Sequence, residues 1–464
     1  MPYVFISYAF VLIFLGLIIY LVYFNIYRRD EIQNSSYNRR QDTQAQYVVR
    51  GSILSSDGEV LAQTVVSDGE DLRDYPCGRL FAHAVGYASH GKSGLESLAN
   101  YDLLTSHCNI IDRVISEFEG ERNPGDNVVT TLSARLQQTC YNVLGDYQGA
   151  ILVMDPATGA ILAMVSKPDF DPNTLNEDWD AMVADESGSE LVNRATQGLY
   201  PPGSVFKIIT GLSYYQKYGA LDGFAFTCQG ELTIQDHTVH CSNGSVHGEE
   251  DLPLAFANSC NCAFSTIGLD LGADNLATTA GTLLFGKKLP CDLPYKKSRF
   301  TLKEEDGAPA MMQTAFGQGN TLVTPYHMGL VTAAIANGGV LMEPQLISQI
   351  VTSDGAIVRE NKSSEYRRLL TENEARAMQS LMEGVVLRGT AAELSGLGYS
   401  VAGKTGSAEY YLGDGNIGTH SWFVGYSNVE DPDIVVVVLA ENGGTGSQTA
   451  VPMAHQIFDA YYYG

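Results

Sequence analysis

Hydrophobic and polar positions follow different periods along the chain, and each period predicts a kind of element. From Tyr3 to Phe24 apolar side chains follow one another without a charged residue, and this run is long enough to cross a bilayer as a helix. Alternating patterns predict β-hairpins at residues 48–66, with Asp57-Gly58 as the turn, and at residues 149–166. The chain therefore begins with one membrane helix and continues with hairpins.

A helical period follows the second hairpin. One buried helix face, ended by Gly219, is predicted by the spacing of Val205, Ile208, Ile209 and Leu212. Nearer the C-terminus, short β-branched and aromatic runs predict strands at residues 399–411, 421–427 and 433–442, and a last helix at 450–462. Successive strands with helices packed on them are typical of an α+β fold built on an antiparallel sheet.

The length of 464 residues exceeds one ordinary core, so we expect more than one unit. We divide the chain into a transmembrane anchor at 1–27, an N-terminal non-catalytic domain at 28–148 and a main domain at 149–464. A polar linker or helix is expected from residue 28 to about residue 48. Residues up to about 147 contain no recognisable catalytic set.

The charges that flank the apolar run bear on its role and orientation. A cleaved signal peptide fits less well than a retained anchor, because the run is too long and no small-residue cleavage site follows it. The first basic residue is Arg28, beyond the run, and the positive-inside rule would keep that side in the cytoplasm. A large domain can nevertheless cross the membrane despite flanking charge.

Composition excludes some functions and leaves others open. Hydrophobic residues make up 45% and charged residues 17%, as in folded globular proteins. The formal net charge of −25 argues against a nucleic-acid partner and against a domain that lies flat on anionic lipid. We expect no nucleic-acid binding.

The eight cysteines are an even number, which permits disulfides in an oxidising compartment. Cys228 and Cys241 bracket a short segment and form the most plausible pair, and free buried thiols are the alternative. Cys260-Asn261-Cys262 has the wrong spacing for a zinc knuckle and no partner pair nearby. We therefore predict no metal site and no cofactor.

Two incompatible motifs overlap near residue 400. Gly398–Thr405 matches the phosphate-loop pattern G-x-x-x-x-G-K-[ST], and Lys404-Thr405-Gly406 also spells the K-T-G of penicillin-reactive serine acyltransferases. A phosphate loop needs a buried strand before it and a helix at its lysine, and the flanking sequence supplies neither. We therefore predict no nucleotide site here.

The acyltransferase interpretation requires two further motifs, and both are present in the expected order. Ser204-Val205-Phe206-Lys207 is a Ser-x-x-Lys at a helix start, and Ser259-Cys260-Asn261 is a Ser-x-Asn. Each triplet alone has an ordinary explanation, such as a helix N-cap for Ser204 or a solvated side chain for Lys207. The ordered trio favours a catalytic site.

The chemistry of acyl transfer explains these residue types. A serine hydroxyl becomes a good nucleophile only when a base removes its proton, and Lys207 lies one helical turn from Ser204. A lysine acts as a base when burial or a neighbouring positive charge destabilises its ammonium, and Lys404 is placed to supply that charge. The helix N-terminus at Ser204 favours a developing oxyanion. Lys404, Thr405 and Ser407 together would attract a substrate carboxylate.

Beyond the trio, the chain resembles the class B penicillin-binding proteins, the monofunctional transpeptidases of bacterial cell-wall synthesis. The likeness extends from the anchor to the last helix. It is carried by "RGSILSSDGEVLA" (50–62), "GKSGLE" (91–96), "DPATGAILAMVSKPDFDPN" (155–173), "NRATQGLYPPGSVFK" (193–207), "ANSCNCAF" (257–264), "FGQGNTLVTPYHM" (316–328), "GTA" (389–391), "AGKTGSAE" (402–409) and "HSWFVGY" (420–426). The resemblance implies a penicillin-binding transpeptidase domain, with an antiparallel sheet flanked by helices and a helical subdomain.

The resemblance also implies roles for single residues. Ser204 forms the acyl-enzyme, Lys207 is the base for acylation and Ser259 relays protons. Asn261 bonds the amide of the peptide or β-lactam, and Lys404 holds the substrate carboxylate with Thr405, Gly406 and Ser407. The backbone N–H groups of Ser204 and Ser407 form the oxyanion hole. Which lysine or relay is the base is disputed in this superfamily.

The implied reaction crosslinks peptidoglycan stem peptides with release of D-Ala, and β-lactam antibiotics trap its first step. The family works outside the cytoplasmic membrane, which places the N-terminus inside. The compact form, without a C-terminal accessory domain, resembles a type that pairs with a membrane-embedded glycan polymerase of the shape, elongation, division and sporulation family. Two alternatives remain: hydrolysis by the same acyl-enzyme, as in a D,D-carboxypeptidase or β-lactamase, and a β-lactam sensor or scaffold.

Overall fold

The first element of the computed structural model is helix α1 (Pro2–Tyr27). Its segment Tyr3–Phe24 has a mean hydropathy of 2.7 and is not buried against the rest of the chain, as expected of a membrane-spanning helix. The structure describes residues 2–27, 47–67, 70–109, 114–115, 118–185, 189–413 and 416–464. Residues 28–46, which make up nearly all of the expected linker, lie outside the described residues.

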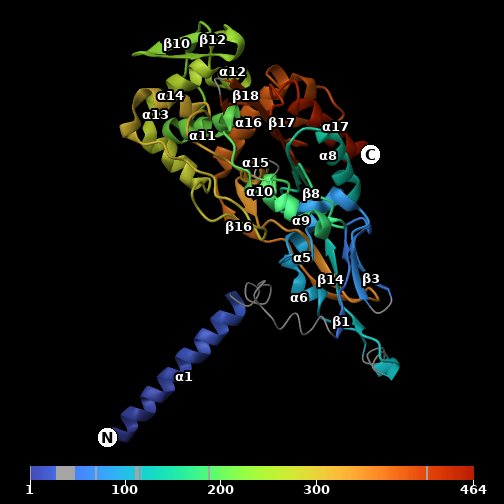
Figure 1. Cartoon of the computed structure of the whole chain (residues 1–464). Coiled ribbons are helices and arrows are strands. Elements are labelled where there is room, and N and C mark those ends of the chain that lie inside the picture. The colour runs from blue at the N-terminus through green and yellow to red at the C-terminus, as the bar shows by residue number, and fades with distance from the viewer. Residues whose placement is uncertain are drawn as a thin grey trace.

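A five-stranded antiparallel sheet organises the larger part of the molecule (Figure 1). In spatial order its strands are β17 (Val401–Gly413), β18 (Asn416–Ser427), β19 (Val435–Ala440), β7 (Gly149–Met154) and β8 (Ile161–Lys167). The predicted hairpin at 149–166 is therefore confirmed as β7 and β8, and the three predicted C-terminal strands are β17, β18 and β19. Every residue of β7 and β19 is buried, which explains why the run "VVVVLA" shows no alternation.

Helices cover both faces of this sheet. On one face, α8 (Ala134–Leu144) and the C-terminal helix α17 (Ala450–Tyr463) pack against each other and against the strands. On the other face lie α10 (Arg194–Gln197) and α15 (Pro325–Ala336), and every residue of α15 is buried. The α+β architecture predicted from the sequence is confirmed, with the core between sheet and helices.

A helical region stands beside β17, the edge strand of the sheet. Helix α16 (Glu372–Arg388) packs against β17 and joins it to the other helices. These helices are α11 (Lys207–Tyr218), α12 (Leu252–Ala257), α13 (Asn261–Thr282) and α14 (Gly307–Ala315), with the 3-10 turns η2 (Gly203–Phe206), η3 (Ser242–Gly244), η4 (Glu304–Asp306) and η5 (Ala392–Leu394). The helix predicted after Ser204 is confirmed as α11, and it ends at Gly219 as expected.

Two short strand pairs extend from the helical region, at the top of Figure 1. Strand β9 (Phe226–Cys228) pairs with β12 (Gly248–Glu250), and β10 (Glu231–Ile234) pairs with β11 (His237–His240). Each pair is a two-stranded sheet, which is marginal without other support. Helix α9 (Leu175–Ala184) and the pair β13 (Val340–Met342) with β16 (Glu365–Arg368) complete this half of the chain.

The N-terminal part is built on a six-stranded sheet. Its spatial order is β15 (Ile357–Glu360), β14 (Ile347–Val351), β6 (Asn127–Thr130), β2 (Ile53–Leu54), β3 (Val60–Ser67) and β4 (Glu70–Asp74). Strands β2 and β3 form the hairpin predicted at 48–66. Strands β14 and β15 come from far along the chain, so this sheet combines two distant segments. The remaining elements here are β1 (Val48–Val49), β5 (Asn123–Pro124), η1 (Gly78–Phe81), α4 (Ala82–Val85), α5 (Gly94–Leu98) and α6 (Asn100–Leu103).

A buried ion cluster holds the N-terminal part together. Glu96 is fully buried, and Arg50 and Arg73 lie within 2.5 and 2.6 Å of its two carboxylate oxygens. Burial alone would raise the pKa of Glu96, but the two guanidinium groups outweigh it and hold the pKa below its ordinary value. Two segments quoted above, "RGSIL" and "GKSGLE", thus meet in one ion cluster.

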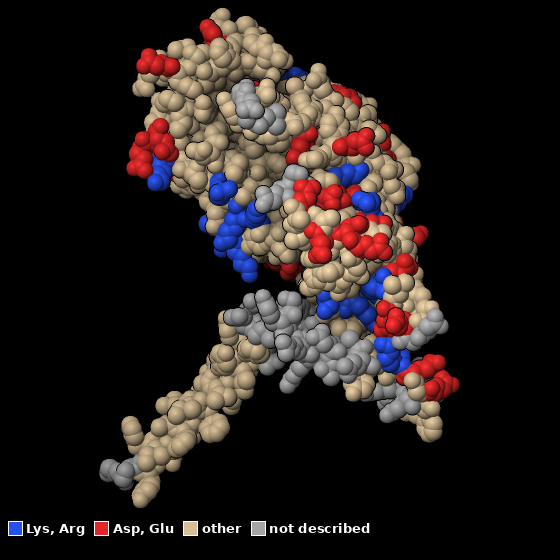
Figure 2. Space-filling model, in the orientation of Figure 1, with Lys and Arg blue, Asp and Glu red and all other residues tan. Residues whose placement is uncertain are grey.

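Charged side chains on the visible face are mixed in sign (Figure 2). Acidic side chains are spread over both parts of this face, and basic side chains form small groups among them. This distribution agrees with the acidic composition.

Candidate active site

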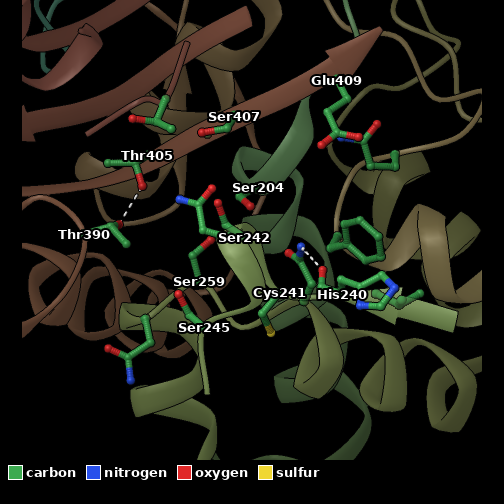
Figure 3. Close-up of a pocket in the computed structure, with 18 of the residues that line it drawn as sticks. Ser204, His240, Cys241, Ser242, Ser245, Ser259, Thr390, Thr405, Ser407 and Glu409 are labelled. Carbon is green, nitrogen blue, oxygen red and sulfur yellow. Dashed lines mark hydrogen bonds between the residues drawn. The ribbon is translucent and has the colours of Figure 1, made fainter. Parts of the chain in front are cut away.

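A cleft of about 1040 Å³ opens between β17 and the helical region. We call it the cleft, and Figure 3 shows it in close-up. Ser204 lies near its centre, Thr405 and Ser407 lie on one side, and Ser259 lies on the other. Residues from all three predicted motifs therefore face one cavity.

Ser204 is placed by the 3-10 turn η2, directly before α11. In a 3-10 turn, side chains at i and i+3 eclipse one another, so Ser204 and Lys207 share a face. Gly203 has φ of +52°, and a Cβ on it would lie 2.7 Å from the Ser407 carbonyl oxygen. The turn thus requires glycine before the serine. The α-helix itself begins at Lys207, three residues later than predicted.

Lys207 is fully buried and donates to three oxygens. Its Nζ lies 2.5 Å from the Ser259 carbonyl, 3.1 Å from Ser259 Oγ and 2.8 Å from Asn261 Oδ1. These acceptors match the three donors of an ammonium. Burial nevertheless lowers the pKa of Lys207 to about 8, so about a tenth of it is the free amine at pH 7. The explanation of Lys207 as a solvated side chain is wrong.

Lys404 faces the same hydroxyl from β17. Its Nζ donates to Ser259 Oγ and to the Thr405 carbonyl, both at 3.0 Å, and the side chain is fully buried. Burial, followed by the charge of Lys207, lowers the pKa of Lys404 well below its ordinary value. The charge of Lys207 thus disfavours an ammonium at Lys404. Ser259 Oγ connects the two amines.

Ser259 and Asn261 are positioned by the turn into α13. Ser259 has φ of +57°, an unusual conformation for a serine, and Cys260 is the N-cap of the helix. Asn261 accepts from Lys207 and donates its amide to the His240 carbonyl at 3.0 Å. Its side chain is thereby fixed between the lysine and strand β11.

The K-T-G segment lies within β17, at the wall of the cleft. Thr405 shares a hydrogen bond of 2.6 Å with Thr390, and Ser407 Oγ accepts from the Gly446 N–H at 3.2 Å. A Cβ on Gly406 would lie 2.9 Å from Trp422, so this position also requires glycine. The strand presents Lys404, Thr405 and Ser407 toward the helical region, as the acyltransferase interpretation expects.

The strand context of this segment differs from that of a phosphate loop. Residues 401–413 are continuously extended, and Lys404 and Thr405 pair with Val424 and Phe423 of β18. A phosphate loop instead begins a helix at its lysine, so that free N–H groups meet the phosphates. The match at Gly398–Thr405 therefore reflects glycine spacing alone.

The cysteines behind the cleft form a cluster that sequence spacing did not predict. Cys228, Cys241, His247 and Cys260 bring one donor atom each to within 4.8 Å of one another. The two sulfurs of the predicted disulfide, Cys228 and Cys241, are 3.7 Å apart and not bonded. The argument that Cys260 has no partner pair nearby is wrong, because the fold of residues 226–250 brings the partners to it.

Sequence reasoning assigned no role to several residues of the cleft. Thr390, within the quoted "GTA" segment, bonds Thr405, and its neighbour Arg388 also faces the cavity. Glu409, also on β17, and the segment 237–245 line the cavity as well. Thr390 and Glu409 lie within quoted segments, which could have marked them, whereas Arg388 and the segment 237–245 reach the cleft only through the fold.

Comparison with known families matches most of the chain. The sequence model of the family described as "Penicillin binding protein transpeptidase domain" matches residues 149–459. A second, described as "Penicillin binding protein A dimerisation domain", matches residues 50–128. The protein named peptidoglycan D,D-transpeptidase PbpA, from Mycobacterium tuberculosis, is 31% identical over an alignment of 445 residues that covers 89% of this chain and 89% of that protein.

The chain is also similar to solved structures of a D,D-transpeptidase domain and of a penicillin-binding protein. The D,D-transpeptidase domain of a peptidoglycan glycosyltransferase from Eggerthella lenta is 31% identical, with a TM-score of 0.79, over 89% of this chain and 98% of that one. Penicillin-binding protein A from M. tuberculosis, as a penicillin G acyl-enzyme complex, is 29% identical with a TM-score of 0.79. That comparison covers 89% of this chain and 99% of the other.

Proposed function

Because the chain belongs to the penicillin-binding protein transpeptidase family, we propose that it is a membrane-anchored peptidoglycan D,D-transpeptidase whose nucleophile is Ser204. The observation that carries the proposal is the meeting of three elements. Ser204 faces the cleft one 3-10 turn from buried Lys207, Ser259 bridges Lys207 and Lys404, and β17 forms the opposite wall.

The first half-reaction forms an acyl-enzyme. Ser204 Oγ attacks the carbonyl carbon of the penultimate D-Ala of a stem peptide, and its proton passes to the neutral amine of Lys207. The N–H groups of Ser204 and Ser407 stabilise the oxyanion of the tetrahedral intermediate. The C–N bond then breaks, and the terminal D-Ala leaves as an amine that takes up a proton.

The residues around Ser204 hold the substrate and relay protons. Ser259 transfers a proton between the lysines and the leaving amine, and Asn261 bonds the peptide amide. Lys404, Thr405, Gly406 and Ser407 hold the terminal carboxylate. In the second half-reaction an amine of a neighbouring stem peptide attacks the ester and frees Ser204.

The same acyl-enzyme explains covalent binding of β-lactams. A β-lactam presents a strained amide and a carboxylate in the positions of the two D-Ala groups, so Ser204 opens the ring and keeps the acyl group. The solved acyl-enzyme of the M. tuberculosis relative with penicillin G supports this assignment.

The proposal extends to the organisation of the chain. Residues 1–27 anchor the protein in the bacterial cytoplasmic membrane, residues 28–148 form a non-catalytic pedestal, and residues 149–464 form the transpeptidase domain outside the cell. The apolar helix and the two family matches support this division. We infer as its partner a membrane-embedded glycan polymerase of the shape, elongation, division and sporulation family.

Fluorescent penicillin tests the nucleophile directly. The full chain in detergent is labelled beside Ser204→Ala, with Ser213→Ala as control, because Ser213 lies buried on the same helix away from the cleft. Label on the parent and on Ser213→Ala, with none on Ser204→Ala, is expected. A label that survives in Ser204→Ala would contradict the assignment. Rapid loss of the label would favour a hydrolase over a transpeptidase.

A further inference from the structure

Beside the cleft, four sulfur atoms and one imidazole gather in a small volume. Cys228 ends β9, Cys241 follows β11, His247 precedes β12 and Cys260 caps α13. The sulfurs of these three cysteines are buried, and the imidazole is half-buried. Cys262 brings the fourth sulfur, 3.5 Å from that of Cys241.

Three of the six separations among these four donor atoms match the edges of a zinc tetrahedron, and all six are within 4.8 Å. With Zn–S bonds of about 2.3 Å, two thiolates on one ion lie about 3.8 Å apart, and a thiolate and an imidazole nitrogen about 3.6 Å. Cys228 to Cys241 and Cys241 to Cys260 are both 3.7 Å, and Cys228 Sγ to His247 Nδ1 is 3.4 Å. We propose that Cys228, Cys241, His247 and Cys260 bind one Zn²⁺ as a closed structural site.

The surroundings of the sulfurs favour thiolates. The Gly230 N–H donates to Cys228 Sγ, and the Ala263 N–H donates to Cys260 Sγ, each at 3.4 Å. Such bonds stabilise negative charge on sulfur, which metal binding requires. Three soft thiolates and one imidazole select zinc over calcium or magnesium, and four protein ligands leave no open position for catalysis by the ion.

Two further side chains, Cys262 and Glu250, lie close to the four proposed ligands but are not among them. Cys262 Sγ lies near the Val239 carbonyl at 3.8 Å and falls outside the group of four mutually close atoms. Glu250 is buried beside Cys260, and its carboxylate also lies outside that group. Both residues therefore serve as controls for the ligands.

The fold gives the ion a structural task. The pairs β9–β12 and β10–β11 are two-stranded sheets, which have too little core to be stable alone. One zinc ion would join both pairs to the start of α13, because its ligands come from all three places. It would stabilise the wall of the cleft formed by residues 237–247.

The ion would also position catalytic groups. Cys260 stands between Ser259 and Asn261, and both of these side chains contact Lys207. Ser259 has a positive φ, so its conformation depends on the restraint of its neighbours. This consequence rests on the proposed function. The metal site itself does not.

Metal analysis of the full chain tests the site. Protein purified in detergent without a metal-affinity tag is measured by inductively coupled plasma mass spectrometry. We expect about one zinc per chain in the parent, in Cys262→Ser and in Glu250→Gln, and loss of zinc in Cys228→Ser and His247→Ala. No zinc in the parent, together with no uptake of Zn²⁺ after reduction, would overturn the proposal.

Two measurements on the parent keep the test independent of how the variants fold. Co²⁺ added to the reduced, chelated parent should produce the ligand-field absorption of a tetrahedral thiolate site, and an octahedral spectrum would refute the geometry. Alkylation under denaturing conditions should modify all eight cysteines. A disulfide between any two of the ligand cysteines would refute it as well.

The effect on catalysis is measured separately. Removal of zinc by a chelator should slow fluorescent penicillin labelling of Ser204 on the order of 10- to 100-fold, the cost of a misplacement of about 1 Å, and added Zn²⁺ should restore it. Normal labelling in a metal-free chain would refute the positioning role and leave the transpeptidase proposal intact. If the chain binds zinc but penicillin does not label Ser204, the transpeptidase proposal is contradicted and the metal site stands.

Discussion

Two of the places where the described part of the molecule buries charge compensate it in opposite ways. In the N-terminal part, the carboxylate of Glu96 is enclosed by Arg50 and Arg73, so opposite charges meet directly. In the cleft, Lys207 and Lys404 are both fully buried, and the oxygens they contact belong to hydroxyl, amide and carbonyl groups.

The difference shows in the pKa values. The arginines hold the pKa of Glu96 below its ordinary value, so this group stays charged at every physiological pH. Burial lowers the pKa of Lys207 to about 8 and that of Lys404 still further below its ordinary range. Compensated charge serves to hold a structure together, whereas uncompensated charge supplies groups that exchange protons near neutral pH.

The largest expected effect is the loss of acylation when Lys207, one of the two buried lysines, is replaced. Lys207→Gln keeps a polar side chain near Ser259 and removes the base, so acylation by penicillin should fall by about 10²- to 10⁴-fold. Lys217→Gln, at the exposed end of the same helix, is the control and should label normally. The second-order rate constant of labelling is the measurement. A loss below about tenfold would remove Lys207 as the base.

Next in size is the effect of breaking the ion cluster. Glu96→Gln leaves two buried guanidinium groups without a countercharge and should lower the free energy of unfolding by about 3 to 5 kcal/mol. Chemical denaturation of the full chain in detergent measures the loss. The exposed Glu59→Gln is the matched control. The folded fraction of Glu96→Gln should still label at the parent rate, and a slower rate would mean that the two charge clusters are coupled.

The pH profile sharpens the comparison without any substitution. Since only the free amine of Lys207 accepts the proton of Ser204, the rate constant should rise with pH and level off above about 8, where the pKa of Lys207 lies. Label formation measured from about two pH units below that value to about two units above it gives the profile. A profile that falls as pH rises through 8 would indicate that protonated Lys207 is the active form.

The smallest effect concerns a neutral contact of the cleft. Thr390→Val removes the 2.6 Å hydrogen bond to Thr405 and should slow acylation by about two- to tenfold, the worth of about 0.5 to 1.5 kcal/mol. The activation free energy of acylation should rise less in the double variant with Thr405→Val than the sum of the increases in the two single variants. Strict additivity would show that the hydrogen bond plays no part in acylation.

Much of the fold and the catalytic trio could be predicted from local pattern. The anchor, both hairpins, α11 and strands β17, β18 and β19 all follow from the spacing of apolar residues and turns, because such elements depend on neighbours in the chain. Ser204 and Lys207 are only three residues apart, so one turn determines their relation.

Long-range features had no such signal. Strands β14 and β15 join a sheet whose other members lie more than two hundred residues earlier, and Thr390 meets Thr405 across two elements. The burial of both lysines likewise depends on the packed structure and not on their positions in the chain.

The sequence by itself determined which residue types carry the chemistry and on which elements they lie. Only the tertiary structure decided that both lysines are fully buried around one hydroxyl, and that four distant ligands, Cys228, Cys241, His247 and Cys260, meet behind it. The reason is physical: periodicity is set by contacts within a few residues, whereas burial and the meeting of distant side chains are properties of the packed chain.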